Sequence, residues 1–248
     1  YDDYLSFLEI NKFLSMINIS VPKIFVTDDT KSIIIMEDFG NNRYDKLINT
    51  IDPKEILIDG INSLIEIHNS QKPIENKFLK KYDLATFTVE IAEFADFYLT
   101  NKNIGKDVVD EFFYIWKSEF ENLNFNWDSF VHKDFELSNL MHLSQRNGHL
   151  KCGILDFQNA FIGFSGWDVF SLLENPRIYF EDKYNNELVE YYFNKTNQNL
   201  PFNEFLVQYY FLNTARQTRI IGRWINLDKK NKNNNYSKYL SVTLKRLE

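Results

Sequence analysis

Hydrophobic and polar positions repeat differently in the first forty residues than in the remainder of the chain. Apolar side chains recur at helical spacing over 4–17, which predicts an amphipathic helix. Two short runs rich in β-branched residues, 23–26 and 32–36, surround a polar turn and predict a hairpin. The pattern then breaks over 37–42, which we interpret as a linker.

From residue 43 onward the pattern is mainly helical. Asp52-Pro53-Lys54-Glu55 supplies an N-cap, a proline at the first helical position and an acid two residues later, which predicts a helix to about His68. Short β runs with polar residues between them occupy 129–160. Further helical patterns cover 85–100, 107–122 and 202–227. The sequence thus predicts an α+β protein: a small sheet-containing N-terminal piece, a linker, and a larger helical piece holding one β-hairpin.

Composition and charge exclude some classes of function. The chain has 248 residues and a formal net charge of -7, without the basic patch of a nucleic-acid binder. Cys152 is its single cysteine, so no internal disulfide can form. No apolar run is long enough to span a bilayer. We therefore expect a cytoplasmic protein with neither nucleic acid nor membrane as partner.

The most informative polar residues surround a predicted turn at Asn147-Gly148. Asn-Gly between two apolar runs favours a two-residue hairpin turn. Counting outward, Asn139 and Asp156 each lie eight residues from that turn. If the turn has two residues and no bulge, they are cross-strand partners on one face. An amide and a carboxylate oxygen together suit Mg²⁺, which takes one or two protein oxygens and completes its shell with phosphate.

Asp134 lies a few residues ahead of that pair, where it could accept a proton from an attacking hydroxyl or orient it. Such a carboxylate beside a metal site is what phosphoryl transfer needs. We expect His132 to shape the loop by hydrogen bonds. A metal hydrolase using His132, Asp134, Asp156 and Asp168 is the alternative, although it lacks the further ligands of a di-metal site.

These residues resemble a known family. His132-x-Asp134-x4-Asn139, followed by Asp156, resembles the catalytic loop and metal-binding motif of the aminoglycoside-phosphotransferase-like branch of the protein-kinase-like fold. Phe157-Gln158 stands where protein kinases have Phe-Gly. The chain is most similar to the bacterial anomeric sugar kinases that phosphorylate N-acetylmuramate or N-acetylglucosamine. The segments that carry this resemblance are 131–141, 155–173 and 215–223, with a late Tyr239-Leu240.

The resemblance implies a two-lobe fold with an incomplete N-terminal β lobe over 1–36, a hinge over 37–42 and a mainly helical lobe over 43–248. A phosphate-covering loop and an ATP-binding Lys would precede residue 1, so we expect an N-terminally truncated chain. The implied roles are the catalytic carboxylate for Asp134 and Mg²⁺ ligation for Asn139 and Asp156. Four further residues have implied roles: backbone contacts to adenine from Glu37, Asp38 and Phe39, and bracing of the catalytic loop by Asp168.

Glu9 on the first predicted helix is a candidate partner for that Lys. Arg216, Arg219 and Arg223 share one face of a long helix, where they would suit an anionic sugar acid or form a salt-bridged surface. The resemblance implies a small-molecule substrate, and the reaction it leads us to expect is ATP-dependent phosphorylation of an amino sugar in cell-wall recycling. The alternatives are another small alcohol (an aminoglycoside, choline or homoserine) and a non-catalytic pseudokinase.

Overall fold

The structure is a computed structural model that describes residues 2–70, 78–123, 127–230 and 235–247. The chain divides into two compact units. Unit 1 comprises 1–81, 127–173 and 181–200, and unit 2 comprises 82–126, 174–180 and 201–248. Among the described residues, no helix combines the length and the apolarity that a membrane span requires.

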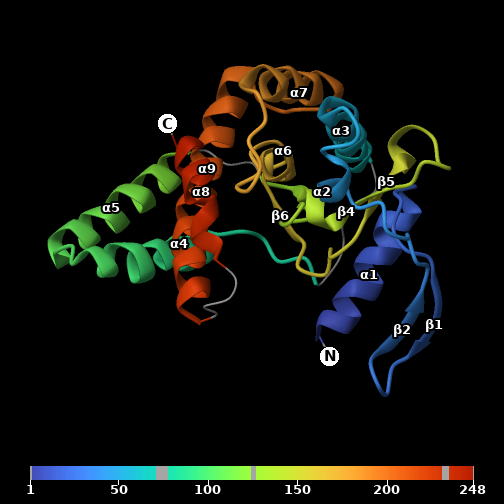
Figure 1. Ribbon diagram of the computed structural model, residues 1–248, viewed down its shortest axis with the longest axis horizontal. Helices are drawn as coiled ribbons and strands as arrows, with labels where there is room; N and C mark the ends of the chain where they lie inside the picture. The colour runs from blue at the N-terminus through green and yellow to red at the C-terminus, as the bar shows by residue number, and fades with distance from the viewer. Residues whose placement is uncertain (1, 71–77, 124–126, 231–234, 248) are drawn as a thin grey trace. The chain divides into compact units, whose positions relative to one another are not determined.

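The N-terminal part of unit 1 is a helix beside a two-stranded hairpin, as predicted (Figure 1). Helix α1 spans Asp2–Met16, and strands β1 (Ile24–Asp28) and β2 (Ile33–Met36) pair antiparallel. The Asp28 carboxylate accepts hydrogen bonds from the Thr30 and Lys31 amides, which shapes the turn. The Tyr4 hydroxyl donates to Asp29 at 2.5 Å and ties α1 to that turn.

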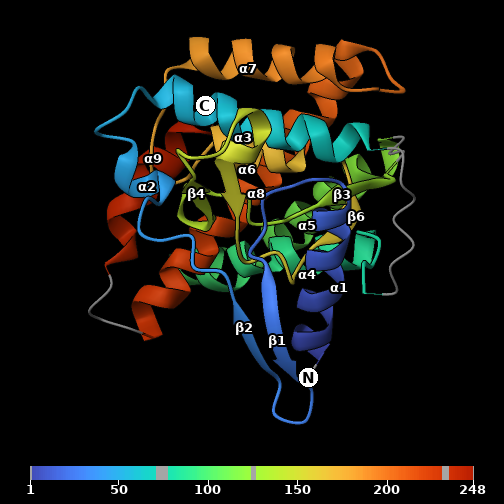
Figure 2. The same cartoon turned by 90° about the vertical axis from the view of Figure 1, so that its right-hand side faces the viewer.

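Helix α3 (Pro53–Asn69) forms where the capping signature predicts it. The Asp52 side chain accepts a hydrogen bond from the Lys54 amide at 2.9 Å, satisfying one of the free donors of the first turn. Its apolar face is buried. Gly60 allows a close approach there, since a Cβ would lie 2.8 Å from Leu172 and 3.6 Å from Phe135. Figure 2 shows α3 alongside α7 (Asp182–Lys195), which covers it.

Two further strand pairs form the centre of unit 1. Strand β4 (Leu140–His142) pairs antiparallel with β5 (Cys152–Ile154), and β3 (Ser129–Val131) pairs with β6 (Phe161–Gly163). The sequence predicted one hairpin here, so the β3–β6 pair is a correction. The two strands have three residues each and lie about thirty residues apart in the sequence, so a pattern within one short segment does not predict that they pair. The remaining helices of unit 1 are α2 (Tyr44–Leu47) and α6 (Trp167–Leu173).

Unit 2 is helical. Helix α4 (Leu84–Phe94) continues into a π-helical turn, Ala95–Leu99, and α5 (Lys106–Asn122) folds back beside it. The long helix α8 (Phe202–Lys230) crosses α4, as Figure 1 shows, and confirms the predicted amphipathic segment. At the crossing, a Cβ on Gly222 would lie 2.2 Å from the Glu93 carbonyl oxygen, so only glycine fits. Helix α9 (Leu240–Lys245) completes the unit.

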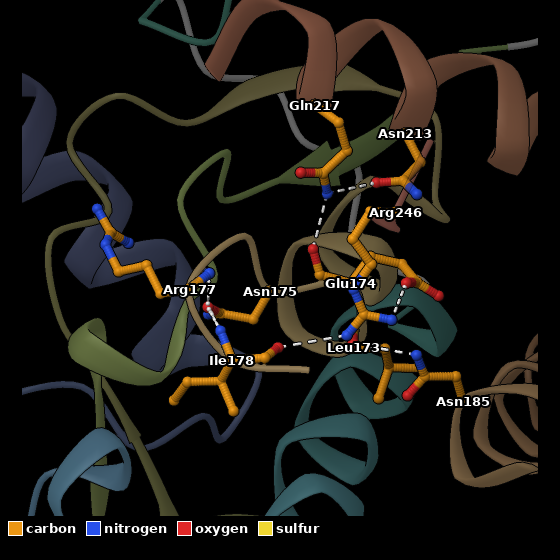
Figure 3. Close-up of polar contacts among 9 residues, drawn as sticks. All are labelled: Leu173, Glu174, Asn175, Arg177, Ile178, Asn185, Asn213, Gln217 and Arg246. Atoms are coloured by element: carbon orange, nitrogen blue, oxygen red, sulfur yellow. Dashed lines mark hydrogen bonds and ion pairs between the residues drawn. The ribbon is translucent and has the colours of Figure 1, made fainter. Parts of the chain in front are cut away.

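A buried polar cluster joins the C-terminal end of the chain to 174–178 (Figure 3). The Arg246 side chain, 2% exposed, forms an ion pair with Glu174 at 2.6 Å and donates to the Ile178 carbonyl. Gln217 donates to the Glu174 carbonyl at 2.8 Å and to Asn213. A desolvated charge needs such partners. The cluster therefore holds Arg246 against 174–178, a segment that Gln217 of α8 also contacts.

Candidate active site

The predicted catalytic loop leaves β3 through a strained turn that α6 holds. The Asp168 side chain, in a residue 1% exposed, accepts hydrogen bonds from the backbone amides of His132 at 2.6 Å and Lys133 at 3.1 Å. The Trp167 indole donates to the Lys133 carbonyl. Lys133 has φ +81°, a left-handed conformation that costs free energy for a residue with a side chain. The loop therefore keeps its shape through these contacts from α6.

His132 joins the loop to the segment that precedes Asp156. The residue is 1% exposed, and its Nε2 lies 2.8 Å from the Leu155 carbonyl oxygen. Since a carbonyl only accepts, Nε2 carries the proton. Burial lowers the pKa of His132 below its ordinary value, which favours the neutral ring. This buried histidine therefore links the loop to Leu155 by a hydrogen bond, which agrees with the structural role expected for it.

Asn139 is tied directly to Asp134. It ends the 3₁₀ turn Leu137–Asn139, and its side-chain nitrogen donates to the Asp134 carbonyl at 2.9 Å. Because the side-chain nitrogen donates to that carbonyl, the amide oxygen, which only accepts, is the atom that could bind a cation. Asp134 is partly exposed to solvent. One side chain thus fixes the spacing between the carboxylate residue and the proposed metal ligand.

The predicted pairing of Asn139 with Asp156 is wrong by one residue. Strand β4 pairs Leu140 with Ile154, and the Leu155 amide donates to the Asn139 carbonyl at 3.0 Å. Asp156 lies one residue beyond this pair and is exposed. Even so, both side chains belong to the same end of the hairpin.

The correction arises at the turn. Only Gly148 has a positive φ, +56°, whereas Asn147 is extended at −121°, so no two-residue turn forms. Instead the Leu143 amide donates to the Lys151 carbonyl and closes a longer connection that contains the 3₁₀ turn Gly148–Lys151. Contacts outside the hairpin stabilise this loop: the Ser63 hydroxyl donates to the His149 carbonyl at 2.7 Å. Such contacts override the local preference of Asn-Gly.

The donors at this end of the hairpin fit Mg²⁺. Asn139 offers an amide oxygen and Asp156 a carboxylate, one oxygen of which accepts from Gln158 at 2.7 Å. Two protein oxygens plus phosphate and water match the preference of Mg²⁺. The hydrolase alternative loses support, because both Asp168 oxygens are occupied by backbone amides. Within the described ranges, no group of three or more His, Cys, Asp or Glu side chains could hold a metal.

The predicted linker packs on the β4–β5 hairpin. Glu37 forms an ion pair with Arg146 at 2.8 Å, and its own amide donates to the Lys23 carbonyl. The Phe39 ring lies under the Arg146 guanidinium, 5.2 Å from its centroid, and against Gly153, where a Cβ would meet it at 2.8 Å. The Asp38 carboxylate accepts from the Gly40 amide. Linker side chains therefore hold the linker against the hairpin.

No contact described for the weaker candidates joins them to the residues above. Glu9 is exposed on α1. On α8, Arg219 pairs with Glu90 at 2.6 Å and Arg223 with Glu93 at 3.0 Å, so two of the three arginines form the salt-bridged surface that the sequence left open. Arg216 is buried, 3% exposed. This row therefore gives no support to an anionic acceptor.

Two residues that the sequence pattern did not indicate have contacts to the candidate site. Arg146 holds two linker side chains, and its position in an irregular loop gave no signal. Gln158 donates to the Asp156 carboxylate. An amide side chain two residues after the aspartate is the sequence feature from which this contact could have been predicted.

Comparison with known proteins identifies the family. The phosphotransferase enzyme family model matches residues 2–202, and the chain belongs to that family. An N-acetylmuramate/N-acetylglucosamine kinase of Caulobacter vibrioides is 25% identical over 239 residues, covering 88% of this chain and 62% of its own length. A kinase of the same description from Neisseria meningitidis is 26% identical over 229 residues, covering 87% and 65%. The chain thus spans less than two thirds of these relatives.

Solved structures agree on the fold. A choline/ethanolamine kinase family protein from Mesorhizobium loti superposes with a TM-score of 0.65 at 14% identity, covering 96% of this chain and 74% of its own. An aminoglycoside phosphotransferase with ADP bound gives 0.58 at 13% identity, covering 99% and 83%. The predicted α+β, protein-kinase-like fold is confirmed.

Proposed function

We propose that this chain carries the catalytic part of an ATP-dependent kinase that phosphorylates a hydroxyl of an amino sugar, N-acetylmuramate or N-acetylglucosamine. The supporting observation is the bond from the Asn139 amide to the Asp134 carbonyl, together with the Leu155 amide on the Asn139 carbonyl. These contacts support the proposal because they join Asp134 and Asn139 at the end of the β4–β5 hairpin where Asp156 follows Leu155. The curated relatives, at about a quarter identity, support the choice of acceptor.

Each residue then has a distinct task. Asp134 orients the acceptor hydroxyl and accepts its proton as the hydroxyl oxygen bonds to the γ-phosphorus of ATP, while the bond from that phosphorus to the bridging oxygen breaks and ADP leaves. Asn139 and Asp156 would hold Mg²⁺, and a bound Mg²⁺ would supply positive charge against the negative charge of the phosphates. His132 and Asp168 keep the loop in its strained shape. Backbone groups of the 37–39 linker contact adenine. Positioning and electrostatics account for most of the rate in such a reaction.

The proposed setting follows from the substrates. ATP is a cytoplasmic metabolite, so the enzyme would act in the cytoplasm on amino sugars released during cell-wall recycling. Other small alcohols such as choline or an aminoglycoside are the competing acceptors.

The test is ADP release from Mg-ATP by the natural open reading frame that contains this chain. N-acetylmuramate, N-acetylglucosamine, kanamycin and choline are compared as acceptors. We expect turnover with one or both amino sugars, and Asp134→Asn should lower kcat by about 10²–10⁴-fold while nucleotide affinity is kept.

The matched control is Asp110→Asn, a change of the same kind at an exposed position on α5. An Asp134→Asn variant with unreduced kcat would overturn the assignment of the catalytic carboxylate. Turnover of choline or kanamycin alone would replace the proposed acceptor. Nucleotide binding without any turnover would favour the pseudokinase alternative.

A further inference from the structure

The Asp156 carboxylate has a neighbour that holds it in place. The side-chain nitrogen of Gln158 donates to one Asp156 oxygen at 2.7 Å. Asp156 itself is exposed and has φ +62°, so burial does not restrict its side chain and its backbone conformation is strained. An exposed carboxylate with free rotamers would present its oxygens in many directions. The hydrogen bond from Gln158 selects among them.

Gln158 is in turn held by α1. Its backbone carbonyl accepts a hydrogen bond from the Ser6 hydroxyl at 2.8 Å, and Ser6 is only 7% exposed. The preceding residue, Phe157, is fully buried and stacks on Phe7 with ring centroids 4.7 Å apart. Ser6 and Phe7 are neighbours on α1, so one helix contacts both residues that follow Asp156.

We propose that Gln158 is a positioning residue for the metal ligand Asp156, and that α1 sets its position through Ser6 and Phe7. With one carboxylate oxygen held by the amide, the second is presented to the cation as a single ligand. Hydrogen bonds of this kind to a metal-binding carboxylate raise the affinity of the site. A glycine at this position, as in protein kinases, would have no side chain to do so. The inference rests on the proposed function, because it takes Asp156 as a ligand of Mg²⁺.

The decisive variant is Gln158→Met, which keeps the length of the side chain and removes the amide. Mn²⁺ serves as the probe, and its binding in the presence of ADP is measured by electron paramagnetic resonance on the natural open reading frame. We expect the affinity for Mn²⁺ to fall about 10-fold, at the lower end of the range for such supporting contacts. Affinity for ADP without metal should be unchanged. This readout requires neither an acceptor nor turnover.

Asn159→Ala is the matched control, because Asn159 is the adjacent residue and is exposed. It should bind Mn²⁺ as the wild type does. Ser6→Ala tests the contribution of α1, and we expect a smaller loss of about threefold. If Ser6 acts through Gln158, the Ser6→Ala change should have almost no additional effect in the Gln158→Met background.

The outcomes separate this inference from the proposed function. Unchanged Mn²⁺ affinity in Gln158→Met, with a wild type that binds Mn²⁺ and ADP, would overturn the inference and leave the kinase proposal intact. A wild type that binds ADP without Mn²⁺ would overturn both the metal site and its positioning residue. Full additivity of the two changes would overturn the part assigned to α1.

Discussion

The predicted catalytic loop in unit 1 and the row of arginines in unit 2 use charged and polar side chains in opposite ways. Around the loop, Asp168 and His132 hydrogen-bond to backbone atoms and are buried. On α8, Arg219 and Arg223 bond to glutamate side chains of α4, with more exposure to solvent. The first arrangement fixes the path of the chain, whereas the second joins two helices that already have their own hydrogen bonds.

This difference has an energetic meaning. A buried backbone amide without a partner costs about 1–3 kcal/mol, so each loop contact is hard to replace. An exposed ion pair contributes about 0–1 kcal/mol, because water competes for both charges. Substitutions at Asp168 should therefore lower the free energy of unfolding much more than substitutions at Arg219 or Arg223.

The largest effect is expected at Asp168. Asp168→Ala would leave the His132 and Lys133 amides without their acceptor and release the positive-φ turn. We predict a loss of roughly 2–4 kcal/mol in the free energy of unfolding, from two unpaired amides. Urea unfolding followed by tryptophan fluorescence measures it.

Asp168→Asn is the matched variant, since its amide oxygen still accepts one hydrogen bond, and it should lose less than Asp168→Ala. An Asp168→Ala protein with the wild-type urea midpoint would show that the Asp168 carboxylate does not hold the loop in its strained shape.

The second effect is a dependence on pH at His68, which supports the strand entering the loop. Its Nε2 donates to the Phe130 carbonyl at 2.9 Å, and its Nδ1 accepts from Tyr192 at 2.6 Å. Burial lowers the pKa of His68 to about 4. The unfolded chain binds this proton first, so stability should be full above about pH 6.5 and fall by about 2–3 kcal/mol as pH drops toward 4.

Urea midpoints at about pH 7.5 and about pH 5 test this expectation. His68→Gln keeps hydrogen-bonding groups without the titrating ring, and it should reduce the difference between the two midpoints. An equal pH dependence in both proteins would assign the acid sensitivity to other groups.

The third effect concerns the arginine row. The Arg219–Glu90 pair is the more enclosed, with side chains 11% and 14% exposed. Arg219→Met retains helix propensity and removes the charge, and we predict a loss of about 1–2 kcal/mol, between the values for exposed and buried pairs.

Arg223→Met is the internal comparison, because its pair is 55% and 28% exposed. It should change stability by at most about 0.5 kcal/mol, and 1 M salt should abolish even that. Equal losses from the two arginines would show that exposure does not rank these pairs.

Local signals predicted much of the fold. The Asp52-Pro53 cap begins α3 where expected, and the periodicity of 202–227 lies within α8. The β1–β2 hairpin forms around its predicted turn. Each of these elements is specified by residues within a few positions of one another. Strand β6 was missed because its three residues pair with β3, about thirty positions earlier.

The candidate site divides in the same way. The types and order of His132, Asp134, Asn139 and Asp156 are legible in the sequence, since a reaction needs particular functional groups. The sequence did not predict the pairing across the hairpin correctly. Contacts of the 143–151 connection with other elements set the register of β4 against β5 and replace the expected Asn-Gly turn.

The sequence by itself determined helices α1, α3, α4, α5 and α8, the first hairpin and the identity of the polar residues, because caps, turns and periodicity act over short distances. Only the tertiary structure decided which acceptor each amide has, which glutamate each arginine meets, and that Gln158 holds Asp156. Those partners lie on different elements or depend on strained backbone angles. Packing brings these partners together, and the spacing of residues along the chain does not predict which partners will meet.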